Sequence, residues 1–229
     1  MKLVPSTAYL FVFALTAATT ALGAAINFRR ADQCPADNSG IKAIKETTVF
    51  FPPDDKSDPK NSCPACSDRD CSKCNTADEI ALVFDGQKNS KVLRSFSRVL
   101  VGFDISHDIP KDGKINECKL EFPDTSGASA IVARDLALEI FKAKSSDWDP
   151  SNVNYSNAPE VGDYVNEAVW KNGGKVTQVD IANACREGLK NGGKFSIYIE
   201  LLDDEMVQLP SLKATSAMCH NTAMKVHIS

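Results

Sequence analysis

Short runs in which apolar and polar residues alternate recur along this sequence, and a period of two is the pattern of a half-buried β-strand. The run 115–122 (INECKLEF) places Cys118, Leu120 and Phe122 on one face and charged side chains on the other. Similar runs lie at 98–105, 136–140, 195–201 and 224–228. Many short strands that do not alternate with helices predict an all-β fold, either a sandwich or a barrel.

One short helix interrupts this pattern. Asp180 is suited to cap its start, and the apolar side chains of Ile181, Cys185 and Leu189 then fall on one face. The dipeptide Asn191-Gly192 ends it, because glycine readily adopts the left-handed conformation that follows many helices.

The N-terminus has the pattern of a secretory signal peptide. Lys2 precedes an apolar stretch at 8–18, and small residues that suit cleavage precede Ala24. No later stretch approaches the roughly 20 apolar residues of a transmembrane helix. We therefore expect a signal peptide at 1–23, no membrane span, and a single extracellular β-sandwich domain at 24–229.

Eight cysteines follow the predicted cleavage site, and an even number in a secreted chain favours disulfides. Four of them lie within 52–77, a stretch rich in Pro, Asp, Lys and Ser, which we predict to be a surface loop cross-linked by its own cysteines. Zinc is the alternative there, although the two cysteine pairs lie closer together than in zinc ribbons. For the dispersed cysteines we expect the pairs Cys34–Cys219 and Cys118–Cys185. The full set is Cys34, Cys63, Cys66, Cys71, Cys74, Cys118, Cys185 and Cys219.

Charge and histidine content exclude several classes of function. Lys and Arg number 26 against 30 Asp and Glu, a net charge of -4, so broad electrostatic binding of nucleic acid is not expected. The three histidines, His107, His220 and His227, lie in no metal or nucleophile motif. We therefore expect no cofactor, no metal and no nucleic-acid partner.

The densest polar motif is SDWDPSN at 146–152. Its carboxylates, Asp147 and Asp149, are candidates for an acid–base pair, or for a calcium site together with Ser151, although the EF-hand spacing is absent. In the structural interpretation, the two aspartates accept hydrogen bonds from backbone amides while Trp148 packs over the end of the sandwich.

Four aromatic residues are candidates for contact with a sugar, because the C–H face of a pyranose ring stacks on aromatic faces. Tyr164, Trp170 and Tyr198 are predicted to face outward, and Tyr155 comes next. Packing is the alternative for each of them. Asn154 begins the sequence Asn-Tyr-Ser, an N-glycosylation sequon, and is therefore expected at the surface.

Three stretches resemble, in the same order, segments of DNRLRE-type domains, the family 96 carbohydrate-binding modules. They are RVLVGFDISHDIPKDGKINECKLEF, LALEIFKAKSSDWDPSNVNYSNAP and VTQVDIANACREGLKNGGKFSIYIEL. The resemblance extends from about Val83 to Ile228. It implies a jelly-roll β-sandwich that binds polysaccharide without cleaving it.

Three hypotheses follow. The first is a secreted, non-catalytic protein that binds a polysaccharide or cell-wall glycan. The second is a secreted structural or protein-interaction module that contacts another protein through the cysteine-rich loop. The third is a polysaccharide-degrading enzyme that uses Asp147 and Asp149.

Overall fold

The computed structural model describes residues 40–51, 81–85, 96–109, 113–122, 135–171, 177–202, 206–210 and 224–229. The predicted signal peptide at 1–23 and the predicted loop at 52–77 lie outside these ranges and stay predictions. Six of the cysteines, and with them the expected pair Cys34–Cys219, also lie outside: Cys34, Cys63, Cys66, Cys71, Cys74 and Cys219. Within the described ranges, no helix combines the length and the hydrophobicity needed to cross a bilayer.

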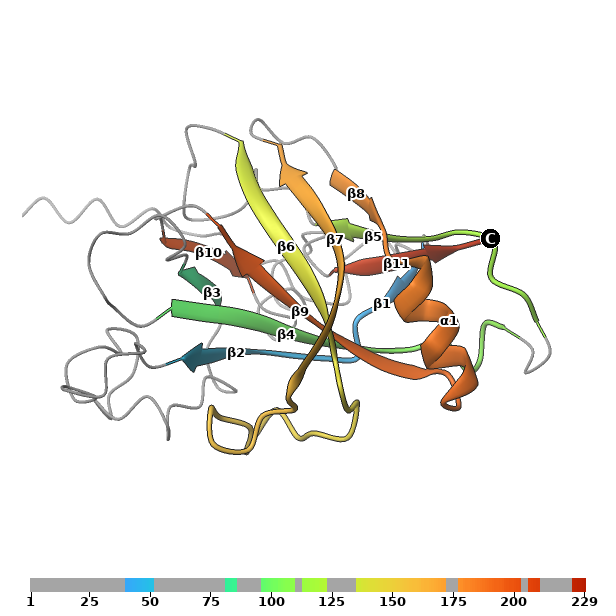
Figure 1. Ribbon diagram of the computed structural model, residues 1–229, viewed down its shortest axis with the longest axis horizontal. Helices are drawn as coiled ribbons and strands as arrows, with labels where there is room; N and C mark the ends of the chain where they lie inside the picture. The colour runs from blue at the N-terminus through green and yellow to red at the C-terminus, as the bar shows by residue number, and fades with distance from the viewer. Residues whose placement is uncertain are drawn as a thin grey trace, which may run out of the picture.

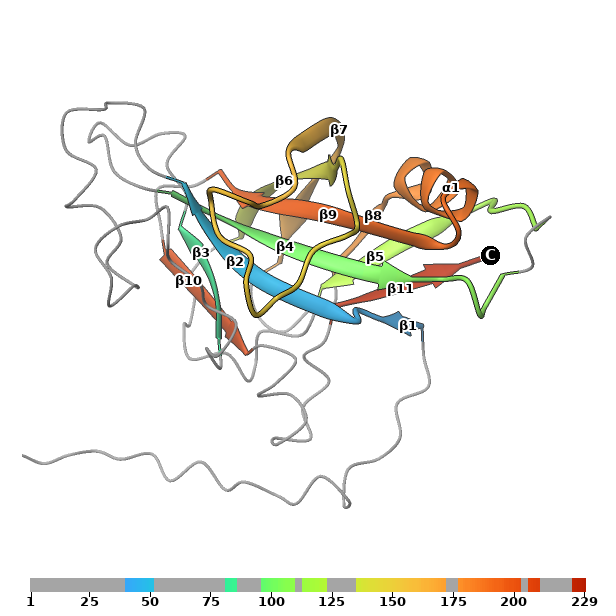
Figure 2. The same cartoon turned by 90° about the horizontal axis from the view of Figure 1, so that it is seen from below.

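Two antiparallel sheets form the layers of a sandwich (Figure 1). The larger sheet has the order β2-β4-β9-β6-β7, and these strands are Lys45–Phe51, Phe96–Asp104, Lys194–Leu201, Leu136–Ala143 and Val161–Trp170. The smaller sheet has the order β1-β11-β5-β8, with strands Ile41–Lys42, Lys225–Ile228, Cys118–Phe122 and Thr177–Asp180. A separate pair, β3 (Ala81–Asp85) and β10 (Met206–Pro210), lies at the opposite end of the molecule from the helix (Figures 1 and 2).

The path of the chain between the two sheets is that of a jelly roll. The chain passes from β4 in the larger sheet to β5 in the smaller one, then through β6 and β7 back to β8, and finally through β9 to β11. The last strand pairs with both β1 and β5, which closes the smaller sheet. This double Greek-key order confirms the predicted all-β, jelly-roll-like sandwich.

The main core lies between the two sheets and follows from the alternation in the sequence. In β5 the side chains of Cys118, Leu120 and Phe122 are fully buried, whereas the residues between them are partly exposed. The larger sheet contributes Val99, Val101 and other inward-facing side chains to the same core. The predicted inward direction of Cys118 is thus confirmed.

Helix α1 (Ala182–Lys190) closes one end of the sandwich. The Asp180 carboxylate accepts a 2.8 Å hydrogen bond from the backbone N–H of Ala182, which satisfies one of the free amides at the helix start. After the helix, Gly192 has a φ of 82°, a conformation that glycine adopts without strain. The predicted disulfide between Cys118 and Cys185 is present and ties α1 to β5 across 67 residues of sequence.

The segment 144–160, which joins β6 to β7, turns back across the larger sheet; we call it the crossing loop. It passes over β9, β4 and β2 on the face turned away from the smaller sheet, here called the outer face (Figure 2). A second cluster of buried side chains lies between the loop and the sheet: Trp148 and Val153 from the loop, and Val49, Leu100 and Tyr198 from the strands. Where the loop covers it, the outer face of this sheet is therefore shielded from solvent.

An irregularity in strand β7 changes which side chains face outward. Trp170 pairs with Leu136 and Asn166 with Ile140, but the next pair joins Tyr164 to Phe141, so one residue of β7 is left over. Such a bulge reverses the alternation of faces along the strand. Tyr164 consequently faces outward, whereas Trp170 faces the core between the sheets.

Candidate functional site

The four aromatic residues predicted to contact a sugar divide into two exposed and two buried. The side chains of Tyr164 and Tyr155 are 52% and 43% exposed. Trp170 is only 3% exposed and packs against Phe122, with ring centroids 5.9 Å apart. Trp170 does not face outward as expected, because it pairs with Leu136 and points with it into the core. Tyr198 does lie on the outer face, but the crossing loop covers it and leaves it 0% exposed.

The exposed tyrosines are the two ends of a row of rings on the outer face. The ring of Tyr155, on the crossing loop, meets that of Phe51 on β2 edge-to-face at 5.4 Å. At the other end, Phe141 on β6 meets Tyr164 on β7 edge-to-face at 5.9 Å. Between the two pairs, the guanidinium of Arg98 on β4 lies 4.7 Å from the Phe51 centroid and 5.6 Å from the Phe141 centroid. We call these five residues the aromatic row.

Acidic side chains lie beside the aromatic row. Arg98 donates from Nε to Glu200 on β9 at 2.7 Å, and both side chains are largely buried. Glu200 is directly opposite Glu139 on β6, and Glu139 is directly opposite Glu167 on β7. Among the described residues, this cross-strand line therefore places three carboxylates and one guanidinium beside the rings.

Tyr198 supports the aromatic row from below. Its hydroxyl donates a 2.6 Å hydrogen bond to the backbone carbonyl of Pro159 in the crossing loop, and its ring meets Phe51 edge-to-face at 6.5 Å. Burial raises the pKa of the Tyr198 phenol, while the charge of Arg98 acts in the opposite direction. Tyr198 thus holds the loop and the row in place and offers no ring face to a ligand.

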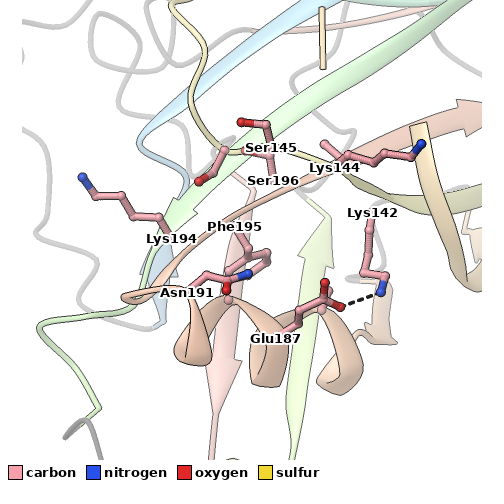
Figure 3. A pocket seen from close by; sticks show the side chains of 12 residues that line it. Lys142, Lys144, Ser145, Glu187, Asn191, Lys194, Phe195 and Ser196 are labelled. Atoms are coloured by element: carbon pink, nitrogen blue, oxygen red, sulfur yellow. Dashed lines mark hydrogen bonds and ion pairs between the residues drawn. The ribbon is translucent and has the colours of Figure 1, made fainter. Parts of the chain in front are cut away.

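A pocket of about 230 Å³ opens between α1, the start of β9 and the first residues of the crossing loop; we call it the α1 pocket (Figure 3). Phe195 lines it, and the side chains of Asn191 and Glu187 come from the helix side. Ser145 and Ser196 approach from the opposite side. The pocket thus joins one aromatic ring to several polar groups.

The charges around the α1 pocket are paired. Lys142 forms ion pairs with Glu187 at 2.5 Å and with Asp163 at 2.9 Å, and the hydrogen bonds to these two carboxylates, Glu187 first, raise the pKa of Lys142. Lys144 pairs with Glu160 at 2.6 Å, and this hydrogen bond raises the pKa of Lys144 and lowers that of Glu160. The two lysines are therefore already neutralised by neighbouring carboxylates.

The second aspartate of the SDWDPSN motif, Asp149, holds a turn. The Asp149 carboxylate accepts hydrogen bonds from the N–H of Ser151 at 2.9 Å, from its hydroxyl at 2.7 Å and from the Asn152 amide at 2.8 Å. The hydrogen bonds from Ser151 lower the pKa of Asp149. Trp148 is 8% exposed and donates from its indole to Ser196 at 2.9 Å. For Asp149 these contacts match the structural interpretation of the motif. Trp148 does pack against the sandwich, but on the outer face of the larger sheet with Leu100 and Tyr198 rather than over its end.

The glycosylation sequon lies on the crossing loop. Asn154 is half-buried, and its side-chain oxygen accepts a 2.9 Å hydrogen bond from the N–H of Ser156. Tyr155 and Ser156 are exposed, so the tripeptide is at the surface. Throughout the described ranges, no three His, Cys, Asp or Glu side chains gather in a way that could hold a metal ion.

Sequence reasoning missed three members of the aromatic row: Phe51, Arg98 and Phe141. The signal for Phe141 was present, because the alternation that assigns Leu138 and Ile140 to the core assigns Phe141 to the opposite face. An aromatic residue on the wet face of a strand indicates a contact surface. Phe51 and Arg98 carried no comparable signal, because their proximity depends on the pairing of β2 with β4.

Comparison with known proteins gives two findings. The model of carbohydrate-binding module family 96 matches residues 67–219, a range that contains the α1 pocket and all of the aromatic row except Phe51. A protein of Arthroderma benhamiae described as an uncharacterized secreted protein is 25% identical over 184 residues, which are 79% of this chain and 83% of that protein.

Proposed function

Because this chain belongs to carbohydrate-binding module family 96, we propose that it is a secreted protein that binds a polysaccharide along the aromatic row without cleaving it. The observation that carries the proposal is the row itself: exposed rings at Tyr155 and Tyr164, joined across the sheet by Phe51, Arg98 and Phe141.

The geometry of the aromatic row suits an extended sugar chain. Neighbouring groups in the row are between 4.7 and 5.9 Å apart, a step comparable with the length of one pyranose unit. The apolar face of a pyranose stacks on an aromatic ring, and polar groups beside the rings bind its hydroxyls. Glu200 and Arg98 supply such groups between the rings. A chain of sugars lying across the strands would meet ring and polar groups in turn.

The charge of the row favours a neutral polysaccharide. Three glutamates lie beside it, and its guanidinium is already paired with Glu200. Like charges repel, so a chain of uronic acids would be disfavoured at this surface. We therefore propose that the ligands are neutral cell-wall glycans and not polyuronates.

Two further observations support the absence of cleavage and the secreted location. Asp149, one of the two candidate catalytic carboxylates, accepts three hydrogen bonds within a turn. The sequence at 1–23 has the signal-peptide pattern, and the Arthroderma benhamiae relative is described as secreted.

The proposal is tested by removing the exposed rings one at a time. Tyr155→Ala and Tyr164→Ala should each weaken binding to an insoluble neutral polysaccharide about 2- to 12-fold, the effect of losing one stacking interaction. The measurement is a pull-down isotherm on a panel of neutral glycans and one polyuronate. Val169→Ala is the matched control, because Val169 is 47% exposed on the same strand but outside the row.

Two results would contradict the proposal. If no glycan binds the wild-type chain, it does not bind polysaccharide under these conditions and the proposed function is rejected. If a glycan binds but both tyrosine variants bind like Val169→Ala, the aromatic row is not the binding surface.

A further inference from the structure

We propose that Asn154 carries an N-linked glycan, and that this glycan covers Tyr155 and so weakens polysaccharide binding at one end of the aromatic row. The modification requires the predicted secretion, and the effect on binding rests on the proposed function. Asn154, Tyr155 and Ser156 form the one Asn-X-Ser/Thr sequence in the chain. The turn that holds these residues, the unbonded amide nitrogen of Asn154 and the position of Tyr155 each support the proposal.

The sequon is held in a hydrogen-bonded turn of the crossing loop. The backbone carbonyl of Asn154 accepts hydrogen bonds from the N–H of Asn157 at 3.2 Å and from that of Ala158 at 2.8 Å. The backbone N–H of Asn154 donates to the Asn157 side-chain oxygen at 2.7 Å, and the Asn157 side-chain amide donates to the carbonyl of Asn152 at 3.0 Å. A sugar attached at Asn154 therefore projects from a fixed point on the loop.

The two ends of the Asn154 carboxamide have different environments. Its oxygen, Oδ1, accepts a 2.9 Å hydrogen bond from the N–H of Ser156. Its nitrogen, Nδ2, is the atom to which an N-linked glycan is attached. In the described part of the chain this nitrogen donates no hydrogen bond, and it is not one of the buried polar atoms that lack a partner. A glycan on Nδ2 therefore leaves the hydrogen bonds of the turn intact.

Attachment of the glycan exchanges one bond for another. Nδ2 forms a bond to the anomeric carbon of an oligosaccharide, and the bond from that carbon to the diphosphate of a polyprenyl carrier breaks. The electron pair of the broken bond leaves with the diphosphate, and Nδ2 releases one amide proton. The co-reactant is thus a lipid-linked oligosaccharide, and the product is a bulky group at the surface of the crossing loop.

Tyr155 lies directly beside the attachment point. Neighbouring Cα atoms are about 3.8 Å apart, and an oligosaccharide of several units is far longer than this distance. The Tyr155 ring is 43% exposed and meets Phe51 edge-to-face, so it is the end of the aromatic row that lies on the loop. A glycan on Asn154 consequently occupies space that a polysaccharide needs in order to stack on Tyr155. Tyr164, at the other end of the row on β7, stays accessible.

The first measurement detects the modification on the full chain secreted from a eukaryotic host. The mass of the protein should fall after treatment with an endoglycosidase. Ser156→Ala removes the sequon and should abolish this change, whereas Ser156→Thr keeps the sequon and should retain it. Asn154→Gln serves as a second variant without the sequon if Ser156→Ala does not fold.

The second measurement asks whether the glycan covers Tyr155, and it needs no polysaccharide. Tetranitromethane nitrates accessible tyrosine rings, and peptide mapping identifies the rings that have reacted. Tyr155 should react several-fold faster in Ser156→Ala than in Ser156→Thr. Tyr164 is the internal control and should react equally in both variants, because it is exposed at the far end of the row.

The third measurement is a pull-down isotherm on insoluble β-glucan, mannan and chitin. Ser156→Ala should bind about 2- to 12-fold more tightly than Ser156→Thr, the effect of regaining one stacking interaction. Adding Tyr155→Ala to Ser156→Ala should cancel this gain. The loss of binding predicted above for Tyr155→Ala therefore applies to the chain without the attached glycan.

The outcomes separate this inference from the proposed function. An unchanged mass after endoglycosidase treatment, or equal nitration of Tyr155 in Ser156→Ala and Ser156→Thr, would show that the inference is wrong. Equal binding by these two variants would refute the effect on the aromatic row. If none of the polysaccharides binds any variant, the proposed function is rejected, while a difference in nitration still supports the covering of Tyr155. If the chain does not reach the medium, the secreted location and the modification are both rejected.

Discussion

At the scale of single residues, Tyr198 links the sheet to the crossing loop through one hydroxyl. The ring is completely buried, and the hydroxyl donates to the carbonyl of Pro159. Burial makes ionisation of this phenol unfavourable in the folded chain, which raises its pKa above the ordinary value of 10.0.

Tyr198→Phe should lower the free energy of unfolding at neutral pH by about 0.5–1.5 kcal/mol, because one hydrogen bond is lost. It should also reduce the loss of stability at alkaline pH. Below pH 10.0 the phenol is neutral in both states, so its contribution is complete. Above that pH the unfolded chain releases a proton that the folded chain retains, and unfolding becomes more favourable.

The measurement is the urea midpoint of wild type and variant as the pH rises through this range. Tyr164→Phe is the control, since it changes an exposed ring. Equal alkaline slopes for the wild type and Tyr198→Phe would show that another group causes the loss.

Tyr198 and Trp170 also show what a sequence can predict about single side chains. Alternation correctly assigns Tyr198 to the outer face, but it does not reveal that a distant loop covers that face. Along β7 a bulge between Tyr164 and Asn166 breaks the alternation, so Tyr164 and Trp170, which a regular strand would place on one face, lie on opposite faces. Burial depends on neighbours that are remote in sequence, and a local pattern contains no information about them.

At the scale of elements, Lys45 on β2 holds the start of the crossing loop against the sheet through hydrogen bonds. Its ammonium donates to the backbone carbonyls of Ser146 at 2.7 Å and Trp148 at 2.6 Å, and it lies 4.4 Å from the centre of the Trp148 ring. Burial lowers the pKa of Lys45, an effect that the nearby charge of Asp147 opposes. One side chain thus satisfies two carbonyls of a loop that has no regular secondary structure.

Lys45→Met should destabilise the folded chain by about 1–3 kcal/mol, because two partly buried carbonyls lose their donor. The effect should be concentrated in the crossing loop, where hydrogen exchange of the amides of Asn152 and Val153 should accelerate. The measurements are the urea midpoint and amide exchange. Lys42→Met, which removes an exposed lysine of the preceding strand β1, is the control. Unchanged exchange in the loop would show that Lys45 does not hold it.

At the scale of the whole molecule, β11 completes the smaller sheet by pairing with β1 on one side and β5 on the other. Val226, at its centre, is 0% exposed and belongs to the main core. The strand that arrives last in the sequence therefore occupies an inner position in the sheet. Native contacts of this kind are distant in sequence, which is typical of slowly folding β-sandwiches.

Val226→Asp should prevent accumulation of folded protein. It places a carboxylate without a partner in the core, a cost of several kcal/mol against a typical total stability of about 5–15 kcal/mol. Ile41→Asp is the matched control, because Ile41 is the direct partner of Val226 but lies half-buried on the edge strand β1. The measurement is the yield of soluble, monomeric protein. Equal yields of the two variants would mean that β11 is not required to close the sheet.

More of the overall architecture than of the candidate site could be predicted from the sequence. Alternation located five of the strands, the helix limits followed from Asp180 and Gly192, and the pairing of Cys118 with Cys185 is confirmed. These features depend on residues that are close in sequence, or on which face of a strand or helix a side chain occupies. The aromatic row combines four strands and the crossing loop, and only the register of the strands brings Phe51 and Phe141 to either side of Arg98.

The crossing loop contributes Tyr155 to the aromatic row and is itself held to the sheet by Lys45 and Tyr198. If a bound glycan holds Tyr155 in place, it must also stabilise the attachment of this loop, and by linkage a firmer attachment must strengthen glycan binding by the same factor. Substitutions beneath the loop would then change affinity for a glycan that they never touch.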